Sequence, residues 1–266
     1  MYPVLIDISE SIKIWSFGTF IVLGFLVAAF YVRRRAHDTL GVDKADSFNL
    51  CFALLFLGLA GARLLYALIK YDEFTNTKMK IFQVWQGGLV WYGGLIVCMV
   101  WLAWYLPRHP KFGGWAMADI LSLGACLAIF VGRWASFLSG ENYGKEAPDL
   151  PWAVTFPHVD YSQAKPLGVP LHPTQLYHSL HGLILFGLLW LFMKRGPHSG
   201  RTTGLFLMLY AIGRSIIEIW RGDDDARGML IDGYVSTSQA ISIPIFFIGI
   251  AIYLSRKARE QEFAPA

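Results

Sequence analysis

The sequence predicts an all-α polytopic membrane protein with seven transmembrane helices and a small extracytoplasmic cap containing short extended segments. Composition is the first observation: of 266 residues, 55% are hydrophobic and only 16% are charged, which fits a membrane protein far better than a soluble domain. Patterning is the second, because seven segments approach the roughly 20 mostly apolar residues that a bilayer-spanning helix needs. We expect one integral membrane domain over 1–266, with the cap inserted at 139–171.

The seven segments are joined by polar connections. Hydropathy alone supports the sixth least, because it is short and carries Arg214 and Glu218. No internal repeat accompanies the set, which counts against transporters built from duplicated halves. The segments cover residues 14–32, 48–69, 88–106, 116–138, 174–193, 204–220 and 238–254.

Basic residues orient the segments, since Lys and Arg concentrate in cytoplasmic loops. They follow the first, third, fifth and seventh segments, at 33–35, at 108 and 111, at 194, 195 and 201, and at 256, 257 and 259. This alternation places the N-terminus outside and the C-terminus in the cytoplasm. Contact with anionic lipid headgroups explains these clusters, and no nucleic-acid partner is expected.

The cap is the only outer connection long enough to build structure. Prolines at 148, 151, 157, 166 and 170 forbid a long helix in it. Residues 152–156 read as a short extended strand between prolines.

Cysteine usage suggests neither a disulfide framework nor a zinc site. Cys51, Cys98 and Cys126 all fall within apolar segments and lack a short Cys-x-x-Cys spacing. We therefore expect no metal ion and no cofactor.

Ionisable residues inside the apolar segments are the best indicators of function, because each needs a partner or water within the bilayer. An arginine at that depth costs several kcal/mol even on lenient insertion scales, and its natural partner is an anion. In the predicted topology one group lies in the outer half or at the outer boundary of the membrane, namely Arg63, Tyr92, Arg133, His172, Glu218 and Arg221.

The sixth segment concentrates this chemistry on one stripe. Tyr210, Arg214, Glu218 and Arg221 follow one another at helical spacing, and Arg214 with Glu218 is an i, i+4 pair. Several arginines near the outer leaflet, under a polar cap, predict a pocket for an anionic lipid headgroup.

Less specific interpretations stay open at several positions. Arg63 suits a structural arginine bonded to helix-end carbonyls as well as it suits a ligand contact. Gly93 and Gly94 suit helix packing as well as close approach of a ligand. His172, before a proline, is more typical of the start of a helix than of a catalytic base. The acidic residues at 223–225 read as a solvated turn, and Glu141 as a carboxylate that orients Arg133 or works beside it.

At this point the residues resemble a family. GRWASFLSGENYG, at 132–144, is similar to the signature of prolipoprotein diacylglyceryl transferases, close to G-R-x-G-N-F-x-N-x-E-x-x-G. Five further stretches occur in the family's order, so the resemblance covers nearly the whole chain; they are WQGGLVWYGGLI, PWAVTFP, HPTQLY, RSIIEIWRGD and STSQAISIP.

The resemblance implies a multi-pass enzyme of the bacterial inner membrane. We expect the chain to work as a monomer. Such an enzyme moves the diacylglyceryl group of phosphatidylglycerol onto the lipobox cysteine in the signal peptide of a preprolipoprotein. The product is a thioether, and glycerol 1-phosphate leaves.

Roles carried over from the family fall on matching positions. Arg133 and Arg214 resemble the arginines that hold the headgroup phosphate, while Tyr92, Glu141 and His172 are unranked candidates for removing the thiol proton. The remaining expected substrate contacts are Arg63, Gly93, Gly94, Ser136, Gly144, Gln175, Tyr177, Tyr210, Glu218 and Arg221.

The chain departs from the family pattern at four positions. Ser136 stands where the signature has Asn, Ala135 where it has Gly, Tyr92 where many members have a His proposed as a base, and Phe17 where the first helix has a tyrosine. A tyrosine with its ordinary pKa near 10 is a poor base at neutral pH.

Two alternatives from other functional classes remain. One is an anionic-lipid transporter that uses the same arginines without chemistry. The other is a degenerate paralogue that binds phospholipid or lipoprotein precursors but no longer transfers, which the substitutions at Ser136 and Tyr92 motivate.

Overall fold

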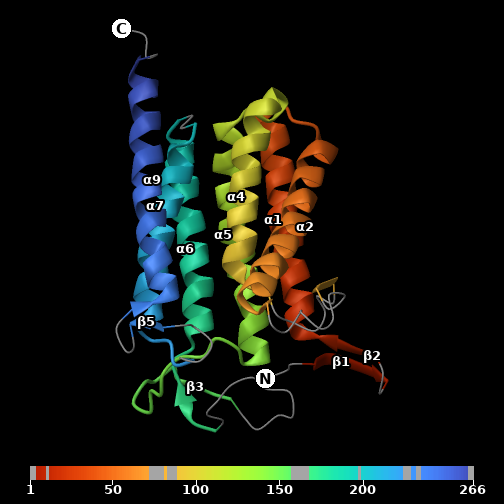
Figure 1. Ribbon diagram of the computed structural model, residues 1–266, viewed down its shortest axis with the longest axis vertical. Helices are drawn as coiled ribbons and strands as arrows, with labels where there is room; N and C mark the ends of the chain where they lie inside the picture. Colours follow the sequence, from red (N-terminus) through yellow and green to blue (C-terminus); the bar gives the residue numbers. More distant parts are fainter. Residues whose placement is uncertain are drawn as a thin grey trace. The chain divides into compact units, whose positions relative to one another are not determined.

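The computed structural model confirms the fold class and a helix at each of the seven predicted segments. It describes residues 4–9, 12–71, 81–82, 89–156, 168–196, 199–223, 229–231 and 235–262. Within these ranges the seven long helices are α1 (Ser16–Leu40), α2 (Lys44–Ile69), α4 (Trp91–Arg108), α5 (Trp115–Ser139), α6 (Thr174–Lys194), α7 (Arg201–Glu218) and α9 (Thr237–Glu262), shown in Figure 1.

Helix ends differ from the apolar limits because polar residues continue a helix beyond the bilayer core. The first helix runs past the basic cluster at 33–35 and ends at Leu40. Gly41 follows with a φ of +66°, and its amide donates to the carbonyl of His37 at 3.1 Å, which is the αL type of helix ending. The third begins at Trp91, and the glycine predicted to open it, Gly88, lies outside the described residues.

Five described helices are long and apolar enough to cross a membrane: α1, α2, α5, α6 and Thr237–Lys257 of α9. The other two, α4 and α7, have 18 residues each. Helix α7 carries the arginine and glutamate that weakened its hydropathy. The chain is a multi-pass membrane protein.

The chain packs as two compact units, one formed by Met1–Tyr31 with Ala118–Ala266 and the other by Val32–Met117. In the second unit, α2 and α4 meet backbone to backbone. A Cβ atom on Gly93 would lie 2.3 Å from the carbonyl oxygen of Gly61, and one on Gly94 would lie 2.5 Å from that of Gly58. Gly93 and Gly94 therefore serve the contact between these helices, one of the two interpretations left open by the sequence.

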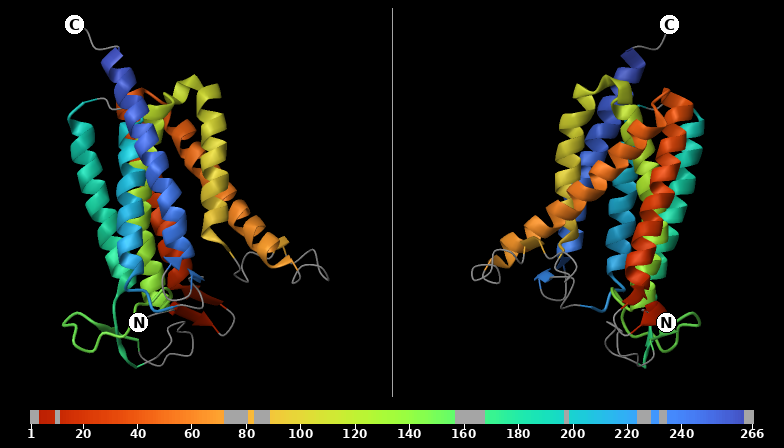
Figure 2. Two further views of the ribbon diagram at one scale, coloured as in Figure 1. Left: turned by 60° about the vertical axis from the view of Figure 1, so that its left-hand side comes forward. Right: turned by 90° about the vertical axis from the view of Figure 1, so that its right-hand side faces the viewer.

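In the first unit, α7 packs against both α6 and α9 (Figure 2). It crosses α9 where Gly204 faces Gly249, each lacking room for a Cβ atom. The N-terminus of α7 is capped by a neighbouring helix, because the Asp119 carboxylate on α5 accepts hydrogen bonds from the amides of Gly200 (2.8 Å) and Thr203 (2.7 Å). Helix α7 is thus fixed along most of its length.

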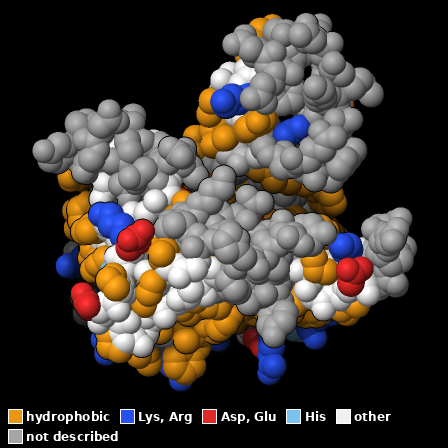
Figure 3. All heavy atoms as spheres, turned by 90° about the horizontal axis from the view of Figure 1, so that it is seen from below, with side chains coloured by type: hydrophobic (Ala, Val, Ile, Leu, Met, Phe, Trp, Pro, Cys, Tyr) orange, Lys and Arg blue, Asp and Glu red, His pale blue; other side chains and the backbone are white. Residues whose placement is uncertain are grey.

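Helix α6 shows the sidedness of a membrane helix. Its buried face carries polar and small residues, including Gln175, His178 and Ser179. Its exposed face carries large apolar ones at helical spacing, namely Leu180, Leu183, Ile184, Leu188 and Leu191. Figure 3 shows hydrophobic side chains reaching the surface beside polar and charged ones. Lipid contact accounts for this exposed apolar surface.

A 3-10 helix, η3 (Pro110–Phe112), and three antiparallel pairs of short strands complete the described fold. The pairs are β1 (Val4–Ser9) with β2 (Ile12–Trp15), β3 (Val154–Thr155) with β4 (Pro170–Leu171), and β5 (Met229–Ile231) with β6 (Val235–Ser236). Strand β3 lies within the extended segment predicted at 152–156. Phe156 and Leu171 are fully buried beneath Tyr143, Val154 and Val169. The cap thus has a small core of its own, although residues 157–167 lie outside the described ranges.

Replacing Gly94 with alanine should lower the midpoint of thermal unfolding. The new methyl group meets the backbone of Gly58, which cannot rotate away, and overpacking of this kind costs about 1–3 kcal/mol. Gly187→Ala on α6 is the matched control, because its Cβ would meet nothing within 4 Å. Unfolding in detergent, followed by intrinsic fluorescence, gives the comparison. Equal midpoints for both variants would show that the contact between α2 and α4 tolerates a side chain.

Candidate active site

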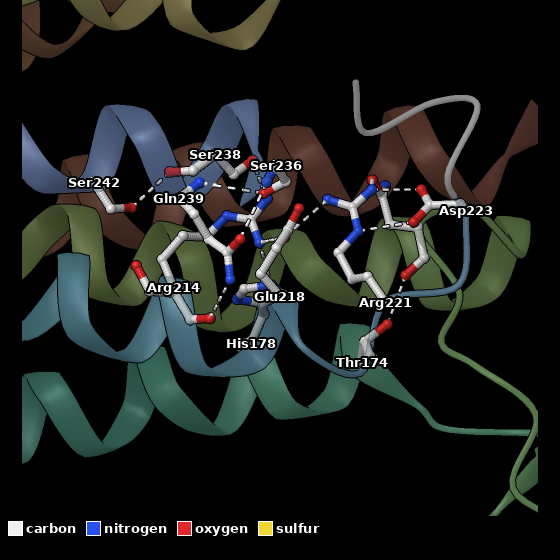
Figure 4. A network of polar contacts seen from close by, with 12 residues as sticks. Thr174, His178, Arg214, Glu218, Arg221, Asp223, Ser236, Ser238, Gln239 and Ser242 are labelled. Carbon is white, nitrogen blue, oxygen red and sulfur yellow. Dashed lines mark hydrogen bonds and ion pairs between the residues drawn. The ribbon is translucent and has the colours of Figure 1, made fainter. Parts of the chain in front are cut away.

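Arg214 lies at the centre of a buried polar network on α7 (Figure 4). Its Nη1 donates to Oε2 of Glu218, so the i, i+4 pair predicted from the sequence is present. Its Nη2 donates to the hydroxyl of Ser238 on α9 at 2.7 Å, and its Nη1 lies 3.3 Å from Nε2 of His178 on α6. Three helices therefore converge on one guanidinium group, whose side chain is only 9% exposed.

Hydrogen bonds in the first turn of α9 fix the position of Ser238. Ser236 and Gln239 form a reciprocal capping box: the Gln239 amide donates to the Ser236 hydroxyl (3.2 Å) and the Ser236 amide donates to Oε1 of Gln239 (3.1 Å). The hydroxyl of Ser242 donates to the Ser238 carbonyl at 2.8 Å. Ser238 thus stands in the rigid first turn of the helix, facing Arg214.

Arg221 extends the network by one turn. Its Nε donates to Oδ1 of Asp223 at 2.8 Å and its Nη2 to Oδ2, a bidentate geometry. Its Nη1 lies 3.7 Å from Oε2 of Glu218, so a single carboxylate serves both Arg214 and Arg221. The solvated turn expected at Asp223 is wrong, because Asp223 is buried and bound to Arg221. Asp224 and Asp225 lie outside the described residues.

Arg133, near the end of α5, differs from these two arginines. It makes no hydrogen bond or ion pair with any residue in the described ranges. Arg214, Arg221 and Glu218 all act on it electrostatically. Among the described residues, this cluster holds three guanidinium groups, those of the arginines, and two carboxylates, those of Glu218 and Asp223. One positive charge is therefore in excess. A partly buried site with excess positive charge favours an anion.

The loop after α5 is held by the start of α6. Gly140 and Asn142 adopt positive φ angles of 78° and 56°, which turn the chain sharply. The Thr174 hydroxyl donates to the Asn142 carbonyl at 2.7 Å, and Nε2 of Gln175 donates to the Glu141 carbonyl at 2.7 Å. Gln175 therefore positions the loop through its side chain.

Asn142 joins this loop to the arginines. Its Oδ1 accepts from Nη2 of Arg221 at 3.1 Å, while its Nδ2 donates to the Ser136 hydroxyl at 3.4 Å. The serine that replaces the expected asparagine in the signature thus still contributes a polar contact. Asn142 was not among the residues predicted from the sequence, because only the fold brings it to a side chain 79 positions away.

Gly144 is required where two segments close on the loop. Its amide donates to the His172 carbonyl at 3.1 Å, and a Cβ atom here would lie 2.4 Å from that oxygen and 2.9 Å from the Trp220 carbonyl. The next amide, of Lys145, donates to the Trp220 carbonyl at 2.8 Å. Any side chain at Gly144 would push apart the segments that carry His172 and Arg221.

Glu141 is not the carboxylate that pairs with Arg133. Within the described ranges Glu141 forms no ion pair. The carboxylates that pair with arginines of the site are those of Glu218 and Asp223. Burial raises the pKa of Glu141 above its usual range.

His172 belongs to an aromatic cluster beside the cap. Its Nδ1 lies 3.1 Å from the hydroxyl of Tyr177, which also accepts the indole N–H of Trp152 at 3.0 Å. The rings of His172 and Tyr177 each lie 6.3 Å from that of Trp220. Burial, and next the charge of Lys145, lower the pKa of His172, so the imidazole is neutral at pH 7.

The remaining predicted residues fall into two groups. Tyr210 lies on α7, where its ring stacks with those of His181 and Phe206. Arg63, Tyr92, Gly93 and Gly94 belong to the other compact unit. There, Nε of Arg63 donates to the carbonyl of Ile81 at 2.9 Å, which matches the structural interpretation left open for this arginine.

His178 is the second functional candidate that the sequence did not reveal. It is buried, with 3% of its surface exposed, and it contacts Arg214 across 36 positions of sequence. The sequence held a signal for it, because His178 follows Thr174 and Gln175 at i+4 and i+3 on the polar face of α6.

No group of three or more potential metal ligands gathers among the described residues.

Changing Asp223 to asparagine should destabilise the fold, because it leaves the buried Arg221 guanidinium without its bidentate anion. Breaking such a pair costs on the order of 3 kcal/mol. Asp149→Asn is the matched control, since Asp149 is exposed in the cap. Denaturant unfolding of both variants measures the difference, and a loss no larger than that of the control would contradict the assigned burial of Asp223.

The stability of the protein should depend on pH through Glu141. Because the folded-state pKa is raised, the native state binds the proton more tightly than the unfolded chain does, and stability falls as pH rises from 4.5 through the folded value. Glu141→Gln should therefore unfold at a higher temperature than the wild type at pH 7 and show no gain near pH 4. A variant less stable than the wild type at pH 7 would reveal a partner for the carboxylate.

Comparison with known proteins identifies relatives along almost the entire chain. Residues 3–255 match the family model described as prolipoprotein diacylglyceryl transferase. Similar curated proteins carry the name phosphatidylglycerol–prolipoprotein diacylglyceryl transferase. One from Solidesulfovibrio magneticus is 32% identical over 263 residues, which is 97% of this chain and 96% of the relative. One from Rhodospirillum centenum is 33% identical, covering 94% and 90%, and one from Geobacter sulfurreducens is 33% identical, covering 91% of each.

Proposed function

The chain belongs to the prolipoprotein diacylglyceryl transferase family, and we propose that Arg133 and Arg214 hold the phosphate of its lipid substrate. It is an enzyme that transfers the diacylglyceryl group of phosphatidylglycerol to the cysteine of a prolipoprotein. One observation supports this assignment of the arginines. Arg133 forms no ion pair with a described residue, and the positive charges of Arg214 and Arg221 act on it, so an anion would be bound favourably there.

In the proposed reaction the lipobox thiol gives up its proton and the sulfur attacks C3 of the glyceryl group. The bond between C3 and the phosphate oxygen breaks, and its electron pair stays on that oxygen. The products are a thioether and glycerol 1-phosphate. Negative charge grows on the departing phosphate, so cations already in place lower the barrier without reorganising.

The remaining site residues support this arrangement in distinct ways. Glu218 and Asp223 keep Arg214 and Arg221 oriented, with Arg221 a weaker contributor to phosphate binding. Gly144 and Gln175 hold the loop that carries Asn142. We assign Ser136, Tyr177 and Tyr210 to the walls around the substrates. Arg63, as a further weak contributor to phosphate binding, and Gly93 and Gly94, as room for the ligand, stay predictions from the sequence.

The topology that we propose brings the two substrates together. The protein lies in the bacterial inner membrane as a monomer, with its N-terminus outside and its C-terminus in the cytoplasm, as the loop charges predict. The lipobox cysteine of a signal peptide then reaches the arginines from the outer half of the bilayer.

Arg133→Ala and Arg214→Ala should each reduce transfer at least about 100-fold, because each removes a cation from the departing phosphate. Tyr92→Phe should have a milder effect. Arg34→Ala is the matched control, since its side chain is 87% exposed and pairs with Asp38. Thioether formation on a lipobox peptide, measured by mass in vesicles containing phosphatidylglycerol, gives the rates. Normal transfer by Arg133→Ala would refute the phosphate assignment.

The same assay separates the alternatives. An anionic-lipid transporter would move phosphatidylglycerol across the vesicle bilayer without any mass increase on the peptide. A degenerate paralogue would retain bound lipid without product. Transfer by the purified wild type excludes both.

A further inference from the structure

His178 is the buried group that the mechanism above leaves unused. It projects from the polar face of α6, and its imidazole Nε2 lies 3.3 Å from Nη1 of Arg214 (Figure 4). The backbone beneath it is fixed against α5, because the Ser179 hydroxyl donates to the Phe130 carbonyl at 2.6 Å. A Cβ on Gly182, one turn further, would lie 2.9 Å from the Cys126 carbonyl, so α6 and α5 are in close contact there. The imidazole is therefore held in place rather than mobile.

The contact with Arg214 defines the state of this imidazole. A guanidinium group has only N–H donors, so Nε2 of His178 must accept the hydrogen bond with its lone pair. The ring is then neutral, with its proton on Nδ1. A neutral imidazole with a directed lone pair is the form needed to accept a proton.

We propose that His178 accepts the proton of the substrate thiol, a role that rests on the proposed function of Arg214 as a phosphate ligand. When the phosphate takes the Nη1 hydrogen bond of Arg214, the lone pair of His178 is released. The thiol proton passes to Nε2, the sulfur attacks C3, and the electron pair of the breaking C–O bond goes to the phosphate. The imidazolium then gives its proton to the departing phosphate oxygen, which restores the neutral ring and balances the reaction.

This assignment gives a reason for the contact between His178 and Arg214: the same guanidinium group binds the Nε2 lone pair in the empty site and the phosphate in the loaded one. Lipid binding itself exposes the base, so an empty site does not deprotonate passing thiols. Two candidates from the sequence fit less well: Glu141 makes no contact with the arginines in the described ranges, and Nδ1 of His172 is engaged with Tyr177.

The test compares two acceptor peptides with the same full-length enzyme in phosphatidylglycerol vesicles. One carries the lipobox cysteine and the other carries selenocysteine, whose selenol is already ionised at neutral pH and needs no base. His178→Gln should transfer to the cysteine peptide about 100-fold more slowly than the wild type, the usual scale of general-base catalysis. With the selenocysteine peptide it should stay within about threefold of the wild type. His181→Gln, one turn along α6, is the control and should leave both rates within about threefold.

The ratio of the two rates decides the outcome, since it does not depend on how much of a preparation is folded. His178→Asn, read in the same way, repeats the test with a shorter amide. Equal losses on both peptides would overturn the proposal, because His178 would then act on the lipid or on the fold. Unchanged transfer to cysteine would also overturn it. No product from the wild type with either peptide would refute the proposed function, and this role with it.

Discussion

Glu218 holds two arginines at once, and the candidate site depends on this shared carboxylate. With 1% of its side chain exposed, it accepts from Arg214 and lies 3.7 Å from Arg221. A buried guanidinium without an anion costs several kcal/mol, and within the described ranges Glu218 is the only carboxylate that pairs with Arg214. Asp223 completes the compensation of Arg221. Arg133 forms no ion pair within the described ranges, and this excess positive charge is the basis for proposing an anion as the ligand.

Helix packing supplies the rigidity that this charge arrangement needs. Helix α7 is capped by Asp119 at one end and crossed by α9 at paired glycines, so the arginines on it have a fixed frame. At the other end, Gly144 allows the loop after α5 to lie between the segments carrying His172 and Trp220. The site is thus assembled from four helices and one loop. Its charges are held in place before any ligand binds, as electrostatic stabilisation of a transition state requires.

Local patterns in the sequence predicted the parts of this structure that depend on neighbours along the chain. Apolar segments placed all seven helices, and the i, i+4 spacing placed Glu218 beside Arg214. Contacts between distant segments were not predictable: Asp223 was assigned to solvent, and neither Asn142 nor His178 was selected. Their roles arise where α6, α7 and the loop after α5 converge, and no periodicity records that convergence. The positive φ of Asn142 is likewise set by tertiary hydrogen bonds.

The excess positive charge at Arg133 should hold a lipid phosphate. Native mass spectrometry of the purified protein with phosphatidylglycerol measures that binding directly, without requiring turnover. Arg133→Gln should retain its fold but bind phosphatidylglycerol at least about tenfold more weakly than the wild type, the effect of losing one charge-assisted contact. Equal retention of the lipid by the two proteins would contradict it.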